Sequence, residues 1–216
     1  MITKYKYTSD HDRSFEKDFN FIDKTIIDFG AKFKSEIVNS EIFNIKNDKY
    51  ATVDLFPIEN SKLHFQGNIN SLHLWQNILK YVTENDKFDY CLISHTLEDL
   101  SNPVFVCRMM KLIAKQGFII VPSKYIESTR INKIWRGHPH HKWIFNFEND
   151  NFIAYPKLNF IEYLDYINDL ENLSSKDNQE LQIFWENDID LKVINDDFLG
   201  PSYHDVLEFY KNLLLN

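Results

Sequence analysis

The sequence predicts a doubly wound α/β fold with a mostly parallel sheet, an antiparallel edge pair and an added β-hairpin. Two apolar runs, Phe88–Ser94 and residues 118–121, have the pattern of strands that are buried on both faces. Residues 104–114 between them are apolar at helical spacing, and Gly117 is expected to end this helix. A strand, a helix and a second strand form a βαβ unit with a right-handed crossover. Ligands of such folds bind beyond the carboxyl ends of the strands, which here points to residues 94–99.

The composition indicates one soluble domain. The 216 residues are 44% hydrophobic and include only five glycines, so the chain can bury a sizeable core, and we expect a single domain over residues 1–216. Residues 1–24 are expected to form an N-terminal extension. No apolar run approaches the ~20 residues of a membrane span, so we expect no membrane partner. Cys91 and Cys107 lie in apolar elements, which favours free thiols and a cytoplasmic location.

The net charge of the chain bears on its partners. A formal charge of −8 at pH 7 disfavours binding to a nucleic-acid duplex, because neutralising phosphates requires a concentrated basic face. We therefore expect no nucleic-acid partner. The oligomeric state is not determined by any feature of the sequence.

The segments before the central unit supply further strands. Residues 25–30 have a buried-strand pattern that ends in an acid and a glycine, and residues 50–55 and 63–69 are the next two strands. About nine residues join the latter two, too few for a helical crossover, so we expect a loop there. Helices are predicted over residues 14–21, 35–43 and 72–83.

The segments after residue 124 are predicted to form a different pattern. Residues 141–147 and 151–155 flank a turn-forming segment, which predicts a β-hairpin. Residues 181–185 and 191–194 are expected to form an antiparallel pair at the sheet edge. Helices are predicted over residues 159–170 and 203–215.

Residues at the ends of four predicted strands resemble the motifs of a known family. They are Asp28, Gly30, Asp54, Gly67, Asn68, Ile69 and Ser94. In this order the segments resemble a class I S-adenosylmethionine-dependent methyltransferase of the type 11-like, small-molecule branch, which has a Rossmann-like sheet. The resemblance covers residues 25–124, with a weaker match in the last strand pair.

The resemblance implies that S-adenosyl-L-methionine is the cofactor. Asp28 and Gly30 match the motif beside its methionine part, and Asp54 matches the acid that binds both ribose hydroxyls. A carboxylate can accept both hydrogen bonds of a vicinal diol. Residues 67–69 match the segment beside the adenine, and Ser94 lies in the loop near the sulfonium.

The chain departs from the family pattern at two places. Lys32 and Lys34 stand where the family has further glycines, whose absence of a side chain allows a close approach of backbone to ligand. Asn68 stands where the family has an acid, although an amide oxygen can still accept a hydrogen bond from an adenine amino group.

His95 is the candidate catalytic residue. A methyl group on a sulfonium is already activated, so the remaining tasks are to align the acceptor and to remove a proton from its hydroxyl. An imidazole with a pKa near ~6.5 suits proton removal. Equally, His95 could only hydrogen-bond the loop backbone and shape the pocket. Glu98 and Asp99 could orient His95, but they also suit the start of a helix.

The segment RGHPHHKW has the most unusual local composition of the chain. Its residues Arg136, His138, His140 and His141 are predicted to contact the acceptor, because guanidinium and imidazole groups suit phosphate and sugar oxygens. They lie within residues 125–158, which we expect to form an inserted hairpin on the acceptor side. The same histidines could instead bind a metal together with His95, Glu98 or Asp99. The sequence lacks H-E-x-x-H and paired C-x-x-C motifs, so we assign no metal ligands.

The sequence therefore predicts transfer of a methyl group from S-adenosylmethionine to a small acceptor. The expected acceptor atom is a hydroxyl of a sugar or a phosphorylated metabolite. Two alternatives remain open at this point. One is a metal-dependent hydrolase in which the histidines and Asp99 activate water. The other is a non-catalytic, methyltransferase-like binding protein.

Overall fold

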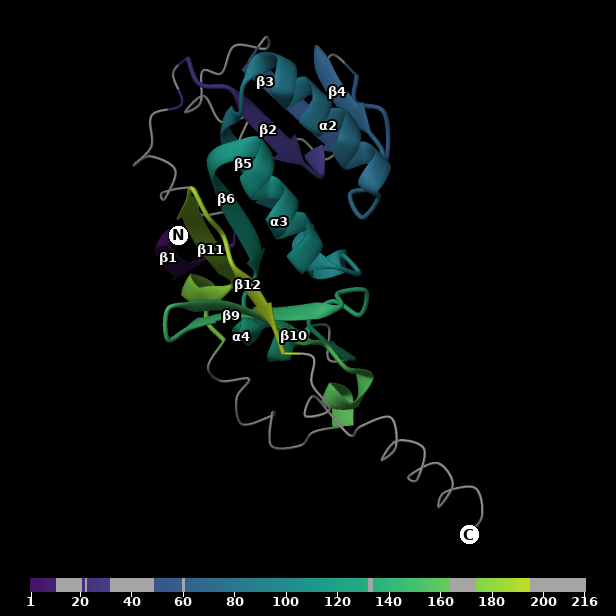
Figure 1. Cartoon of the computed structure of the whole chain (residues 1–216). Helices are drawn as coiled ribbons and strands as arrows, with labels where there is room; N and C mark the ends of the chain where they lie inside the picture. Colours follow the sequence, from purple (N-terminus) through teal and green to yellow (C-terminus); the bar gives the residue numbers. More distant parts are fainter. Residues whose placement is uncertain are drawn as a thin grey trace.

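The computed structural model describes residues 1–10, 21, 23–31, 49–59, 61–131, 134–163 and 174–194. These residues form a seven-stranded sheet, a three-stranded sheet and a two-stranded sheet. Figure 1 shows the large sheet with its helices in the upper part of the view and the three-stranded sheet below it. Within the described part of the chain, no helix has the length and apolarity needed to cross a membrane.

Five strands of the large sheet are parallel and doubly wound. They run in the order β4 (Leu63–Gln66), β3 (Tyr50–Asp54), β2 (Ile26–Phe29), β5 (Phe88–Ser94) and β6 (Ala114–Pro122). The chain thus winds outward from β2 in one direction and then restarts at β5 in the other. The predicted fold class is confirmed, and the point of reversal between β2 and β5 is where ligands of such sheets bind.

Two helices cover one face of this sheet, as Figure 1 shows: α2 (Leu72–Asn85) and α3 (Pro103–Ile113). Ile27 and Phe29 of β2 belong to the core cluster on this face. Asn102 caps α3, because its side chain accepts a hydrogen bond from the Phe105 N–H at 3.0 Å. The indole of Trp75 is fully buried, and its N–H donates to the Ile69 carbonyl at 2.7 Å. This bond ties α2 to the loop after β4.

Gly117 lies within β6 and does not end the preceding helix, so that prediction is wrong. α3 ends at Ile113, and β6 begins directly at Ala114. A Cβ at position 117 would lie 2.2 Å from the Cys91 carbonyl oxygen and 2.9 Å from the Trp185 indole. The glycine is therefore required by the packing of the indole against the strand.

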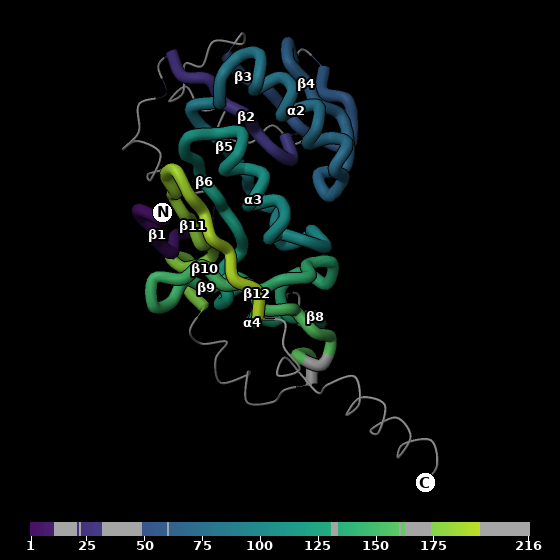
Figure 2. The backbone as a smooth tube through the Cα atoms, viewed as in Figure 1, coloured from purple at the N-terminus to yellow at the C-terminus, as the bar shows by residue number. Residues whose placement is uncertain are grey.

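The antiparallel edge is built differently from the predicted pair. β11 (Glu180–Glu186) pairs with β6 on one side and with β1 (Ile2–Thr8) on the other. β12 (Leu191–Val193) pairs instead in parallel with β10 (Asn151–Pro156) of the small sheet. The chain turns away after β11 at Asn187, which has a φ of 61°. Figure 2 shows β1, β11 and β6 side by side and β12 leaving toward β10.

The sequence analysis assigned no strand to the first eight residues, although they form β1. Their alternation of Lys4 and Lys6 with Tyr5 and Tyr7 is a period-two pattern typical of an edge strand. The first residues therefore contribute to the main sheet.

The predicted hairpin is confirmed. β9 (Trp143–Glu148) pairs antiparallel with β10, and the turn residues Asn149 and Asp150 both have positive φ, 48° and 59°. This is the geometry of a type I′ turn. The remaining short elements are α4 (Lys124–Ser128), β7 (Arg130–Ile131), β8 (Trp135–Arg136) and the 3₁₀ segments η5 (Leu97–Asp99), η6 (Asn159–Tyr163) and η8 (Lys176–Asn178).

Several predicted helices fall on residues outside the described part. These are residues 35–43, residues 203–215 and, except for Phe21, residues 14–21. Lys32 and Lys34 also lie outside it. Of the helix expected over residues 159–170, the described beginning is the 3₁₀ segment η6.

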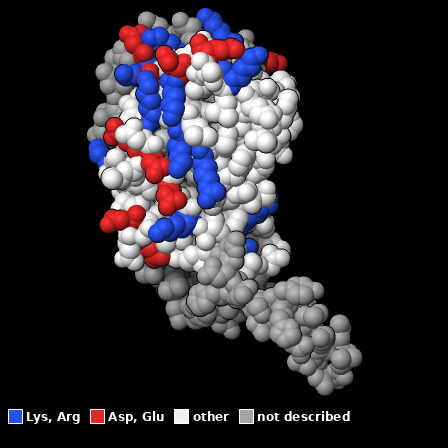
Figure 3. All heavy atoms as spheres, in the orientation of Figure 1, with Lys and Arg blue, Asp and Glu red and all other residues white. Residues whose placement is uncertain are grey.

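Basic and acidic side chains are interspersed on the face seen in Figure 3. Among the ion pairs are Lys111 with Asp188 at 2.7 Å and Lys115 with Asp89 at 2.8 Å. Solvent-exposed pairs of this kind contribute little to stability, about 0 to 1 kcal/mol each. The fold is therefore stabilised mainly by its apolar core.

Candidate functional site

Two cavities lie at the carboxyl ends of the parallel strands. The first, which we call the strand-end cavity, has a volume of about 320 Å³ and is lined by residues that follow β2, β3, β4 and β5. Of the seven residues predicted to bind a cofactor, five line it: Gly30, Asp54, Gly67, Asn68 and Ile69. Parallel strands bring these separate segments together at one edge of the sheet.

Gly30, which follows β2, packs closely against Thr96 in the loop after β5. Its φ is 77°, and its N–H donates to the Val53 carbonyl at 2.9 Å. A Cβ at this position would lie only 2.3 Å from the Thr96 hydroxyl oxygen. A glycine is thus needed both for the left-handed backbone and for the close approach of Thr96. Thr96, which belongs to the segment 94–99 where the sequence predicted a ligand, also lines the cavity.

Asp54 is held at the cavity wall by its own loop. Its Oδ1 accepts a hydrogen bond from the Phe56 N–H at 3.0 Å, and its carbonyl accepts one from the Gly67 N–H at 2.9 Å. Apolar side chains, including Val53, Ile69 and Leu100, form much of the remaining wall. The cavity therefore combines one oriented carboxylate with apolar surfaces.

Two asparagines in the loop after β4 have different roles. The Oδ1 of the exposed Asn68 accepts a hydrogen bond from the Asn70 N–H at 2.9 Å, which fixes the turn. The Oδ1 of Asn70 is buried and accepts no hydrogen bond from the residues that the structure describes. Asn70 lines the cavity and can therefore offer an acceptor to a ligand. Sequence analysis named Asn68 and missed Asn70.

Asp28 and Ser94 lie outside both cavities, contrary to the sequence analysis. Asp28 is fully buried within β2, and the Tyr50 hydroxyl donates to its Oδ2 at 2.5 Å. Alternation along the strand turns Asp28 to the face opposite Ile27. The Ser94 carbonyl accepts a hydrogen bond from the Thr96 hydroxyl at 3.0 Å, so Ser94 supports the loop.

The second cavity, which we call the histidine cavity, has a volume of about 480 Å³. It is lined by His95 and by three of the four residues predicted to contact the acceptor: His138, His140 and His141. Asp99 lines both this cavity and the strand-end cavity. The two cavities are therefore neighbours, and the loop after β5 separates them.

His95 is enclosed between two buried carboxylates. Its Nε2 lies 2.9 Å from Glu180 Oε1, its Nδ1 lies 3.5 Å from Glu98 Oε1, and the side chains of both glutamates are 1% exposed. Burial alone would lower the pKa of His95, but the hydrogen bond to Glu180 and the nearby carboxylate of Glu98 outweigh burial and raise this pKa to about 10.

With a pKa of about 10 His95 is protonated at neutral pH, which does not fit its expected role as a proton acceptor. Its contacts are carboxylates and not the loop backbone of the alternative interpretation. Glu98 has the orienting position that sequence analysis considered for it. Glu180 comes from β11, 85 residues later in the sequence, and was not predicted.

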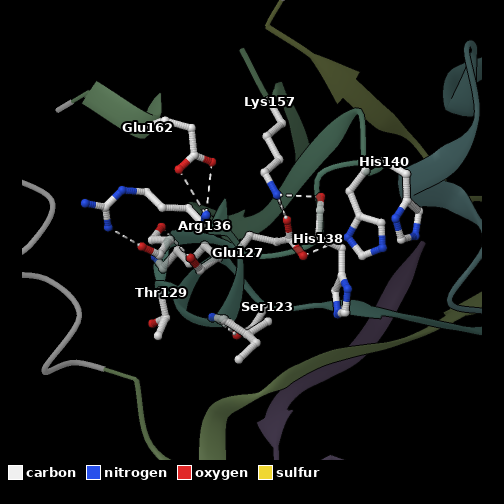
Figure 4. A network of polar contacts seen from close by, with 12 residues as sticks. Ser123, Glu127, Thr129, Arg136, His138, His140, Lys157 and Glu162 are labelled. Carbon is white, nitrogen blue, oxygen red and sulfur yellow. Dashed lines mark hydrogen bonds and ion pairs between the residues drawn. The ribbon is translucent and has the colours of Figure 1, made fainter. Parts of the chain in front are cut away.

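Arg136 does not line the histidine cavity, so the structure contradicts its predicted contact with the acceptor. The residue is fully buried, and its guanidinium donates to the Ser128 carbonyl at 2.7 Å. Its backbone N–H donates to the Glu162 carboxylate at 3.0 Å. Figure 4 shows Arg136 and Glu162 on one side of Glu127, with His138 and His140 on the other.

The three cavity histidines stand close together. The ring centroids of His138 and His141 are 4.8 Å apart, and those of His140 and His141 are 4.6 Å apart. Burial and the neighbouring imidazoles lower the pKa of His138. His138 is therefore neutral at a lower pH than an isolated histidine would be.

Glu127 supports the histidine cluster through its contact with His141. Its Oε1 lies 2.7 Å from His141 Nδ1, and Lys157 forms an ion pair with its other oxygen. Burial opposes ionisation of Glu127, but His141 and Lys157 outweigh burial and hold its pKa below the usual range. Lys157 also donates to the His138 carbonyl at 2.8 Å, as Figure 4 shows.

Comparison with known proteins found similarity in structure alone. No protein-family model and no curated protein matches the sequence. A solved S-adenosylmethionine-dependent methyltransferase from Listeria monocytogenes is 12% identical, with 78% of this chain and 93% of that chain covered and a TM-score of 0.44. A second, from Mesorhizobium loti, is 11% identical, with 70% and 64% covered and a TM-score of 0.39.

A third solved structure is a Haloferax volcanii methyltransferase in a complex with a methyltransferase activator. It is 9% identical, with 77% of this chain and 82% of that chain covered and a TM-score of 0.43. At such low identity the similarity concerns the fold and gives no residue roles. The doubly wound α/β fold itself is established by the strand order of the main sheet.

Proposed function

We propose that this protein transfers a methyl group from S-adenosylmethionine, bound in the strand-end cavity, to a small acceptor in the histidine cavity. The observation that carries this proposal is the position of Asp99, which lines both cavities beside the reversal point of the sheet. A methyl transfer requires two adjacent sites, one that binds the methyl donor and one that binds the acceptor. Two neighbouring cavities on either side of one loop meet that requirement.

The residues of the strand-end cavity fit the adenosine part of this cofactor. Its volume of about 320 Å³ lies at the lower end of the range for ligand sites. Asp54 is the candidate partner for the ribose hydroxyls, and apolar side chains such as Ile69 and Leu100 suit an adenine ring. The buried Asn70 Oδ1 is the candidate acceptor for the adenine amino group.

S-adenosylmethionine, when bound, supplies an activated methyl group, so the chain has to align the acceptor and receive its proton. His95 is already protonated between Glu98 and Glu180. Among the described residues, no carboxylate lies within ion-pairing distance of His138, which also lines the cavity. His138 is therefore the candidate to receive the proton of an acceptor hydroxyl.

Of the two acceptor classes expected from the sequence, the neutral sugar-like one fits better. Four carboxylates line the histidine cavity, from Asp10, Glu98, Asp99 and Glu180, and they repel a phosphate. Arg136, the expected phosphate-binding group, is buried elsewhere. We therefore propose a hydroxyl of a neutral or cationic small molecule as the methyl acceptor, and O-methylation as the reaction.

Calorimetric titration of the full chain with S-adenosylhomocysteine tests the donor site. We expect micromolar binding that Asp54→Ala weakens about a hundredfold or more, because two charge-assisted hydrogen bonds are lost. Asn70→Ala is expected to weaken binding about tenfold. Glu84→Ala, on the exposed surface of α2, is the matched control and leaves the affinity unchanged. Absence of binding to folded wild-type protein, or equal affinity in Asp54→Ala, would overturn the proposal.

A further inference from the structure

We propose that Asp99, His140 and His141 form a binding site for a divalent transition-metal ion in the histidine cavity. One ligand atom from each residue lies within 4.8 Å of the other two. Tetrahedral zinc with ligands near 2.1 Å places its ligand atoms roughly 3.4 Å apart. Modest side-chain rotation therefore brings the three atoms to ligand distance. The proposal concerns metal binding and does not depend on methyl transfer.

His141 is oriented as a metal-binding histidine usually is. Its Nδ1 hydrogen bonds to the buried Glu127 carboxylate at 2.7 Å, and Lys157 holds that carboxylate from its other oxygen. Because the Glu127 carboxylate accepts this bond, Nδ1 is the protonated nitrogen in the neutral tautomer of His141, and Nε2 is the nitrogen that can bind a metal. A carboxylate that fixes the distal nitrogen of a histidine is the characteristic support of a metal ligand.

Asp99 offers an oxygen that the protein leaves without a hydrogen bond. Its Oδ1 is buried and accepts none from the residues that the structure describes, and the nearest histidine nitrogen, His140 Nε2, lies 3.9 Å away. The Asp99 side chain as a whole is 43% exposed, so leaving this one oxygen without a partner has a moderate cost. An ion between these two atoms would remove that cost.

The two segments that carry the ligands are connected by hydrogen bonds that end on main-chain carbonyls of residues 98–100. The Lys142 N–H donates to the Glu98 carbonyl, and its Nζ donates to the Asp99 carbonyl, both at 2.7 Å. The Trp143 indole N–H donates to the Leu100 carbonyl at 2.7 Å. The two segments that carry the ligands are therefore fixed relative to each other before any ion arrives.

The ligand set indicates the class of ion. Two imidazole nitrogens and one carboxylate oxygen suit zinc and related first-row divalent ions, whereas magnesium and calcium prefer oxygen ligands. Three protein ligands leave a position for an acceptor oxygen, whose pKa a metal would lower. The excess of carboxylates around the cavity also attracts a dication.

A second group of possible ligand atoms, from Asp10, His95 and Glu180, does not qualify. Both nitrogens of His95 already face carboxylates, at 2.9 Å and 3.5 Å, and carry protons. A protonated nitrogen has no lone pair for a metal. Asp10 lines the same cavity as the proposed ligands, so its replacement is a stringent control for general charge attraction.

Titration of the chelator-treated full chain with Zn²⁺, followed by calorimetry, tests the site. Co²⁺ binding followed by visible absorption reports the coordination geometry. We expect one saturable site per chain with micromolar or tighter affinity. His140→Ala and Asp99→Asn should each weaken binding about tenfold or more, and Glu127→Gln about ten- to a hundredfold. His140 is exposed, so its replacement leaves folding intact.

Asp10→Asn removes only a general electrostatic attraction and should weaken Zn²⁺ binding by less than about threefold. No saturable binding to wild-type protein would overturn the proposal, and so would equal weakening by Asp10→Asn and His140→Ala. Asp54→Ala separates the two proposals, because it should lose S-adenosylhomocysteine and keep Zn²⁺. Zinc binding without cofactor binding would refute the methyl-transfer function alone, and the reverse result would refute the metal site alone.

Discussion

Replacing His95 by glutamine should change the pH dependence of stability. The pKa of His95 is about 10 in the folded protein against an ordinary value of 6.5. Because the folded-state value is raised, the charged histidine stabilises the fold fully below pH 6.5, and this contribution disappears as the pH rises through about 10. Wild type should therefore lose stability relative to His95→Gln across that interval.

The size of this stability change depends on how deeply His95, Glu98 and Glu180 are buried. Glu98 and Glu180 have side chains that are 1% exposed, but the His95 side chain is 37% exposed to the cavity. Solvent screening on that side reduces the contribution well below what the pKa difference alone would give. We expect His95→Gln to lower the free energy of unfolding by about 2 kcal/mol at pH 6. The difference should fall toward zero near pH 10.

Urea unfolding of both proteins, at intervals from pH 6 to pH 10, measures this difference. His95 has a φ of 46°, and glutamine at such a backbone conformation costs some stability. That cost is independent of pH, so the pH dependence isolates the charge. NMR titration of the wild-type imidazoles provides a direct check, since His95 should not titrate between pH 6 and pH 8.

A difference between the two proteins that stays constant from pH 6 to pH 10 would refute the reasoning. So would an NMR titration of His95 near its ordinary pKa. His140→Gln is the matched control, because its side chain is 64% exposed and lies 3.9 Å from the nearest carboxylate. It should change stability by less than about 0.5 kcal/mol.

Three further substitutions test the fold and the site. Gly117→Ala should lower the free energy of unfolding by about 2 to 3 kcal/mol in urea, since its Cβ would lie 2.2 Å from the Cys91 carbonyl oxygen; an unchanged midpoint would contradict this packing. Gly30→Ala should weaken S-adenosylhomocysteine binding at least tenfold in calorimetry, because its Cβ would displace Thr96; equal affinity would mean that this loop does not form the site. Arg136→Lys should lower thermal stability by about 2 kcal/mol, because the buried guanidinium donates to the Ser128 carbonyl; an unchanged stability would contradict this structural role.

The strand-end cavity could largely be predicted from the sequence. Apolar runs separated by helices indicate parallel strands, and the carboxyl ends of parallel strands meet at one edge whatever the details of packing. Gly30, Asp54 and residues 67–69 directly follow such runs, so their convergence depended only on local pattern and chain order. Asp28 was misplaced because it lies within β2 opposite Thr52, two positions before the strand end at which Asp54 and Gly30 lie, and is buried there.

The properties of the histidine cavity depend on the tertiary structure and could not be predicted from the sequence. The charge of His95 depends on Glu180, which β11 brings beside it from 85 residues away, and no local pattern encodes that contact. Residues that are close in the sequence also have different environments. Arg136 is buried and bonds to the Ser128 carbonyl, whereas His141 bonds to Glu127 and lines the cavity. Periodicity determines which elements form, whereas protonation and ligand geometry depend on which side chains those elements bring together in space.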